Sequence, residues 1–368
     1  MAFELDFPKA FAAYTEGVER QQHFGMQIYV SHDGDVLIDK AIGLLGPEER
    51  ALDSDDLMMW MSASKPVAAV AIAQLMESGK LDYDDPVCEY IDDFGMFGKS
   101  IVTIRHILTH TSCFPNIEMP FEMPDWDEAI EMICEHPLEE GWVVGETAAY
   151  HSRSSWFILG ELIRRLGERP FQDYVREEIF LPLGMENSWI GMDPARFPEY
   201  RERLGHTYNT AHGHCVIINT HSEKAVTACI PAGNGRGPVR ELGRFHEMLL
   251  GGGERDGQRI LQSDTVAEMT RRHRVDKYDE TFMHKIDWGL GLIINSNRHG
   301  AETVPYGYGK HASEETFGHG GRETVSAFAD PGNRLVVITA FNGMPGEPRH
   351  TARVRDFNTA LYEDLDLA

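Results

Sequence analysis

The fold is decided at Trp60-Met61-Ser62-Ala63-Ser64-Lys65-Pro66-Val67. Here an apolar run from Leu57 to Met61 meets an Ala-rich amphipathic run from Val67 to Met76, which predicts a short strand leading into a helix. Residues three apart on a helix share one face, so Lys65 Nζ can reach Ser62 Oγ. A serine hydroxyl is a weak nucleophile until a neighbouring desolvated lysine accepts its proton. Ser and Lys are common residues, and these four positions alone favour Ser62 as a plain helix N-cap.

The composition restricts the classes of partner. The chain has 368 residues, of which 42% are hydrophobic, so it can bury a large core. It carries 34 Lys and Arg against 59 Asp and Glu, a formal net charge of −25. An acidic chain repels phosphate backbones and anionic lipid, so we expect no nucleic-acid partner and no membrane partner. No apolar run approaches the roughly 18 residues of a membrane-spanning helix.

Cysteine and histidine usage points away from metals and disulfides. The five cysteines include no Cys-x-x-Cys pair, and an odd number suits reduced thiols in a cytosolic protein. Met1 to Pro8 lacks the basic and apolar regions of a signal peptide, so we predict a cytoplasmic location. One cluster has metal-binding side chains, but its spacing matches no zinc pattern, and we expect solvated loop histidines and no cofactor. Its members are His206, His212, His214 and Cys215.

The two ends of the chain contain the strand signals, and the middle is helical. A helix is predicted over 7–22, a hairpin over 24–30 and 35–42, and a second hairpin over 325–329 and 335–341. A further strand is predicted over 288–294 and a last helix over 349–363. Helix signals dominate 80–190, with segments at 84–91, 103–108, 125–135, 154–166 and 171–180.

This order predicts an α/β (α+β) fold, with an antiparallel sheet flanked by the N- and C-terminal helices and an inserted, mostly helical lobe. The sheet lobe would comprise 1–80 and 205–368, and the helical lobe 81–204. The first and last strands would be neighbours in the sheet. Ser62 would then lie at the boundary, with the active site in the cleft between the lobes.

Two further motifs accompany Ser62-x-x-Lys65. They are Gly145-Glu146-Thr147-Ala148-Ala149-Tyr150-His151-Ser152 and Phe317-Gly318-His319-Gly320-Gly321-Arg322. Together the three resemble the serine β-lactamase and penicillin-binding-protein superfamily, in particular its branch of class C β-lactamases and family VIII carboxylesterases. Supporting phrases at 103–112 and 182–185 extend the resemblance over roughly residues 10–360.

The resemblance implies a role for each motif. Ser62 would be the acylated nucleophile, Lys65 its base or proton shuttle, and Tyr150 a second base. A tyrosine has an ordinary pKa near 10. Cationic neighbours or hydrogen bonds would therefore have to favour the Tyr150 phenolate, or Lys65 would have to share its work. The backbone N–H groups of Ser62 and Arg322 would form an oxyanion hole.

Gly320 and Gly321 would lack side chains because substrate lies against their strand. The chain also departs from the family pattern. Ser152 replaces the usual Asn, which puts the anchoring of a substrate amide in doubt. His319 stands where β-lactamases carry Lys, and a histidine is mostly uncharged at neutral pH. The Arg322 guanidinium would replace that cation if it pointed into the cleft.

Trp142, Trp288 and Tyr308 are candidates for the acyl pocket, although such aromatics can equally be core residues. We expect a serine hydrolase acting on a small ester or amide, with esterase favoured over β-lactamase activity. An acyltransferase that uses the same acyl-enzyme stays open, as do a D-amino-acid peptidase and the oligomeric state. Retention of Ser62, Lys65 and Tyr150 argues against a non-catalytic binding protein.

Overall fold

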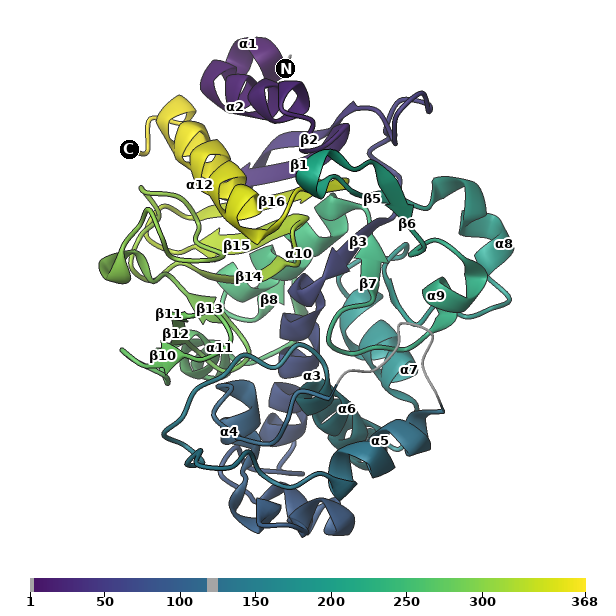
Figure 1. Ribbon diagram of the computed structural model, residues 1–368, viewed down its shortest axis with the longest axis vertical. Coiled ribbons are helices and arrows are strands. Elements are labelled where there is room, and N and C mark those ends of the chain that lie inside the picture. Colours follow the sequence, from purple (N-terminus) through teal and green to yellow (C-terminus); the bar gives the residue numbers. More distant parts are fainter. Residues whose placement is uncertain (1–2, 118–124) are drawn as a thin grey trace.

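The computed structural model describes residues 3–117 and 125–368. A seven-stranded sheet, ordered β12-β13-β14-β15-β16-β1-β2, organises one half of the molecule (Figure 1). All its neighbouring strands are antiparallel. The first long strand pairs with the last, Met26 opposite Phe341, as expected. The strands are β1 (Gly25–His32), β2 (Asp35–Gly43), β12 (Asp287–Trp288), β13 (Ile293–Ile294), β14 (Phe317–Gly321), β15 (Val325–Asp330) and β16 (Leu335–Phe341).

Helices cover both faces of this sheet because side chains alternate along each strand. Ile28 and Val30 pack with residues of α2 (Pro8–Glu19) and α12 (Glu347–Asp364), which lie beside each other in Figure 1. Tyr29 points to the opposite face, where its hydroxyl donates to Glu247 of α10 (Val239–Leu250). A short helix, α1 (Phe3–Asp6), precedes α2.

The other half is mainly helical and surrounds α3 (Lys65–Glu77), the helix that follows Ser62. Almost every side chain of α3 is buried, as is typical of a central helix. It packs against α6 (Ser154–Gly167). The remaining helices are α4 (Ile104–Leu108), α5 (Trp126–Glu135), α7 (Phe171–Val175), α8 (Phe197–Tyr200), α9 (Glu223–Thr227) and α11 (Ser263–Thr270).

Smaller sheets connect the two halves. β3 (Met58–Met61) pairs with β7 (Gly235–Gly237), which pairs with β4 (Trp189–Ile190). A second small sheet contains β17 (Gly343–Met344), β5 (Thr207–Asn209) and β6 (Val216–Ile218). The hairpins are β8 (Glu254–Arg255) with β9 (Gln258–Arg259), and β10 (Tyr278–Asp279) with β11 (His284–Lys285).

Two local predictions were wrong. The segment 288–294 is two short strands joined by a turn, because Gly291 has φ +75° and a Cβ at this position would lie 2.5 Å from Ala69. The helix expected over 84–91 is only a 3₁₀ turn at Val87–Glu89. Residues Phe317–Gly321 of the third motif form β14. In the described part of the chain, no helix has the length and apolarity needed to cross a membrane.

Candidate active site

Ser62 stands at a sharp turn between β3 and α3. Met61, just before it, has φ +50° and ψ −136°, a strained backbone for a residue with a side chain. Ser64 holds this turn: its hydroxyl donates to Met61 O at 2.7 Å and accepts the N–H of Gly235 at 2.9 Å. Ser62 begins a 3₁₀ turn, Ser62–Ser64, and is partly exposed. The turn therefore leaves the Ser62 hydroxyl partly accessible to solvent, whereas the Ser64 hydroxyl is occupied in holding the backbone.

Lys65 lies directly beneath this hydroxyl. Its Nζ is 3.0 Å from Ser62 Oγ and donates to Ser152 O and Ala232 O at 2.9 Å each. The side chain is fully buried, and burial, reinforced by the Arg153 guanidinium, holds the pKa of Lys65 well below its usual value. A neutral amine has two N–H groups and one lone pair. In the neutral form of Lys65, with both N–H groups on carbonyls, the lone pair would face Ser62 Oγ.

Tyr150 completes the group from the segment before α6. Its Oη donates to Ser62 Oγ at 2.8 Å, and Lys65 Nζ lies 5.1 Å from the centre of its ring. Burial raises the pKa of Tyr150, and the Ser62 hydrogen bond only partly opposes this effect. Tyr150 is therefore a neutral phenol. The cationic environment that a phenolate would need is not provided, because burial also favours the neutral form of Lys65.

His319 lies on β14 beneath these residues. It is 1% exposed, and its ring centre lies 6.0 Å from that of Tyr150 and 5.6 Å from that of Trp288. Its Nδ1–H donates to Gly320 O at 2.7 Å. Burial and the neighbouring Lys65 lower the pKa of His319 to about 3. The imidazole is neutral, as expected, but it is enclosed in the protein and does not face the solvent.

The next residues of β14 pack against the protein itself. A Cβ on Gly320 would lie 2.1 Å from the ring of Tyr306, and one on Gly321 would lie 2.3 Å from Trp60 O. These contacts, rather than room for substrate, require glycine here. The Arg322 side chain is 72% exposed, and its Nε lies 4.0 Å from Glu323. Its guanidinium therefore lies in solvent, whereas His319 is buried.

Asn116 is a site residue that the motifs did not reveal. Its Oδ1 accepts the N–H groups of Ser152 and Arg153 at 3.1 and 3.2 Å, and its Nδ2 donates to Ser152 Oγ at 2.9 Å. The chain thus supplies a carboxamide beside Ser152, although Ser152 replaces the family's usual Asn. Asn116 lies on a loop 36 residues before Ser152, and no spacing rule connects the two.

The aromatic residues divide differently from the prediction. Trp288 is stacked near Tyr150 with ring centres 5.9 Å apart, whereas Tyr308 is a core residue whose hydroxyl donates to Ile293 O. Trp142 lies half-buried on a loop. Phe282 is a second site residue that the motifs did not reveal. The centre of its ring lies 4.6 Å from that of Tyr150 and 5.6 Å from that of Tyr306. No recognisable motif surrounds either missed residue.

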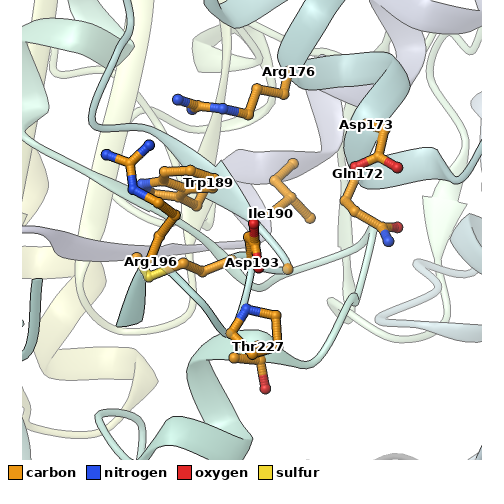
Figure 2. Close-up of a pocket in the computed structure, with 11 residues that line it drawn as sticks. Gln172, Asp173, Arg176, Trp189, Ile190, Asp193, Arg196 and Thr227 are labelled. Atoms are coloured by element: carbon orange, nitrogen blue, oxygen red, sulfur yellow. The ribbon is translucent and has the colours of Figure 1, made fainter. Parts of the chain in front are cut away.

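The histidine cluster lies outside the group formed by Ser62, Lys65 and Tyr150, and so does one pocket of the structure. His206 pairs with Glu49, and within 3–117 and 125–368 no three metal-binding side chains gather as a metal site would require. Figure 2 shows a pocket of about 410 Å³ in which the Arg176 guanidinium lies 3.7 Å from the centre of the Trp189 ring. None of the residues lining it belongs to the Ser62 group.

Known proteins resemble this chain over most of its length. The family model described as Beta-lactamase matches residues 11–361. The esterase/beta-lactamase LipL of Mycobacterium tuberculosis (strain ATCC 25618 / H37Rv) is 26% identical over 322 residues, which cover 80% of this chain and 73% of LipL. Penicillin-binding protein 4* of Bacillus subtilis (strain 168) is 24% identical over 77% of this chain. The match spans only 62% of that protein.

Solved structures share the fold. A penicillin-binding-protein homolog from Caulobacter crescentus and a family VIII carboxylesterase each superimpose with a TM-score of 0.79 at 24% identity. Each match covers 98% of this chain and 97% of the other. The D-amino acid amidase from Ochrobactrum anthropi SV3 gives a TM-score of 0.75 at 19% identity, over 98% of this chain and 99% of the amidase. The chain belongs to the beta-lactamase family and is a serine hydrolase of the β-lactamase and penicillin-binding-protein superfamily.

Proposed function

We propose that Ser62 attacks a small ester and forms an acyl-enzyme that water then hydrolyses. The observation that carries this proposal is the arrangement of Lys65, whose Nζ lies 3.0 Å from Ser62 Oγ while two backbone carbonyls take its N–H groups. A buried neutral amine in this position accepts the hydroxyl proton as Ser62 Oγ bonds to the carbonyl carbon.

Tyr150 acts with Lys65 as one proton-transfer unit. As a neutral phenol it donates to Ser62 Oγ at 2.8 Å in the resting state, and it passes a proton to the leaving group as the tetrahedral intermediate collapses. Lys65 then returns the proton that it holds to Tyr150. In deacylation the same unit takes a proton from the attacking water and gives it to Ser62 Oγ as the bond between Oγ and the acyl carbon breaks and the acid is released.

The developing oxyanion is bound by the backbone N–H groups of Ser62, which begins the 3₁₀ turn after β3, and of Arg322, which directly follows β14. Ser152 and Asn116 form the polar side of the substrate site, with Phe282 and Tyr306 on the apolar side. Substrate enters between the sheet lobe, 1–80 with 205–368, and the helical lobe, 81–204.

We assign esters rather than β-lactams as the favoured substrates. A substrate carboxylate at β14 would find no lysine cation there, because His319 is buried and neutral. The exposed Arg322 lies beside Glu323, which offsets its charge. Charge-assisted hydrogen bonds are roughly twice as strong as neutral ones. Losing one should cost about ten- to thirtyfold in kcat/KM for an anionic substrate.

A substrate comparison tests this assignment. We expect kcat/KM for p-nitrophenyl butyrate at pH 7.5 to exceed that for nitrocefin by at least about tenfold. Replacing His319 by Lys should narrow the gap, because it restores an amine at the position where β-lactamases carry lysine. A nitrocefin value equal to or above the ester value would contradict the proposed preference. A protein that hydrolyses neither substrate and takes no acyl label would contradict the proposed function as a whole.

A further inference from the structure

The backbone around Tyr150 is held by two segments, which contribute the buried side chains of His110 and Asp279. Ala149 N donates to His110 O at 3.0 Å, and His151 N donates to His110 Nδ1 at 3.1 Å. On the other side, Tyr150 N donates to Asp279 Oδ1 at 3.1 Å, while Thr281 Oγ1 donates to Tyr150 O at 3.0 Å. Both backbone polar groups of Tyr150 are therefore fixed by the 279–282 segment.

The Asp279 carboxylate is the centre of this arrangement. Besides Tyr150 N, its Oδ1 accepts the N–H groups of Thr281 and Phe282 at 3.0 Å each. The ring of Phe282 then packs on the ring of Tyr150, with centres 4.6 Å apart. One oxygen atom thus sets the backbone position of Tyr150 and of the aromatic side chain that covers it.

Arg274 neutralises this carboxylate inside the protein. Its Nη2 lies 2.9 Å from Asp279 Oδ2, and the two residues are 1% and 0% exposed. The guanidinium also donates to Thr109 O and Ile286 O and lies 5.2 Å from the centre of the Trp288 ring. A buried ion pair contributes little net stability compared with apolar residues of similar size. The position of this pair, next to the backbone of Tyr150, therefore indicates a positioning role.

We propose that the Asp279–Arg274 pair, together with Thr281, positions Tyr150 for proton transfer at Ser62. The proposal rests on the function assigned to Tyr150 above. Proton transfer depends steeply on the distance between Tyr150 Oη and Ser62 Oγ, and a displacement of about 1 Å can cost on the order of a hundredfold in rate. Asp279, Arg274 and Thr281 are positioning residues, because each acts only through Tyr150 and its immediate neighbours.

Thr281 provides the mildest test, because its side chain is exposed and its replacement disturbs little packing. Thr281→Val removes the hydroxyl that holds Tyr150 O and keeps the shape of the side chain. It should lower kcat for p-nitrophenyl butyrate about three- to tenfold and leave KM unchanged. Thr281→Ser retains the hydroxyl and should stay within about twofold of wild type. Asp279→Asn should lower kcat by more than about tenfold, because the amide no longer pairs with Arg274.

Asp330→Asn is the matched control. Asp330, the last residue of β15, is also a fully buried carboxylate. It accepts hydrogen bonds from Ser313, Asn333 and Tyr362. Its replacement should lower the melting temperature without lowering kcat in the protein that remains folded.

The decisive measurement repeats the Thr281 and Asp279 substitutions in a Tyr150→Phe background and follows, in both backgrounds, the rate at which a fluorophosphonate phosphonylates Ser62. If Thr281 and Asp279 act through Tyr150, their substitution should lower this rate by less than about twofold relative to the Tyr150→Phe variant alone. A loss in that background equal to the loss in wild type, or an unchanged kcat for Thr281→Val in the wild-type background, would overturn the positioning role alone. A Tyr150→Phe enzyme with wild-type kcat would overturn the proposed function and this inference with it. If Asp279→Asn does not fold, the two Thr281 variants decide the question.

Discussion

The floor of the candidate site, formed by Ser62, Lys65, Tyr150 and His319, differs sharply from its rim, formed by Asn116, Ser152 and Arg322. On the floor, Lys65 and His319 are almost completely enclosed, and burial favours the uncharged form of both side chains. On the rim, Asn116, Ser152 and Arg322 are exposed. Under the proposed function, the buried floor carries out the proton transfers and the exposed rim contacts substrate.

Substitutions on the floor should therefore have the largest effects. We expect Lys65→Met and Tyr150→Phe each to lower kcat by at least about 10³, and the double variant to lose little more, because the two residues act as one unit. The measurement is steady-state hydrolysis of p-nitrophenyl butyrate. Fully additive losses would contradict a shared unit.

Two controls sharpen this contrast. Lys99 is a second buried lysine, whose Nζ donates to backbone carbonyls of Cys134 and His136 away from Ser62. Lys99→Met should reduce stability but not kcat. On the rim, Asn116→Ala should raise KM by a few-fold and change kcat far less than the floor variants do. If Asn116→Ala lowered kcat as much as Tyr150→Phe does, the distinction between floor and rim would fail.

A smaller effect concerns stability in acid. The pKa of His319 is about 3 in the folded protein and near 6.5 when unfolded. Between these values the unfolded state binds the extra proton, so the free energy of unfolding falls as the pH falls below about 6.5. Replacing His319 by Gln removes this contribution to the pH dependence of the free energy of unfolding. From pH 7.5 to 4.5 the variant should lose less stability than wild type, by on the order of 2 kcal/mol.

Urea unfolding at the two pH values measures this difference. The exposed His136 offers a control, since His136→Gln leaves the floor unchanged. Equal losses in wild type and His319→Gln would show that His319 is not held neutral by burial.

The floor could be predicted from the sequence because its signals are local. Ser62 and Lys65 lie one helical turn apart, and Tyr150 stands in a recognisable motif. The strand-rich ends of the chain likewise predicted the pairing of β1 with β16, which the structure confirms. The burial of His319 was not predictable, because Gly320 and Gly321 were expected to leave room for substrate, whereas close contacts with Tyr306 and Trp60 require glycine at these positions of β14.

The rim and the support of Tyr150 depend on tertiary contacts. Asn116 reaches Ser152 from 36 residues away, and Asp279 reaches Tyr150 from 129 residues away. Neither residue belongs to a motif of its own. Phe282 likewise contacts Tyr150 only because the 279–282 segment folds around the Asp279 carboxylate. A single sequence contains no periodicity that reports such contacts.

The central claim is that Ser62 is the nucleophile, and mapping the residue that a fluorophosphonate modifies tests it most directly. The protein would be treated with a fluorophosphonate, digested, and analysed by peptide mass spectrometry, with Ser62→Ala treated in parallel. The account predicts one adduct on Ser62 and none in Ser62→Ala, whose melting temperature should stay within a few degrees of wild type. An adduct on Ser64 or Ser152, or full labelling of the folded Ser62→Ala variant, would contradict the account.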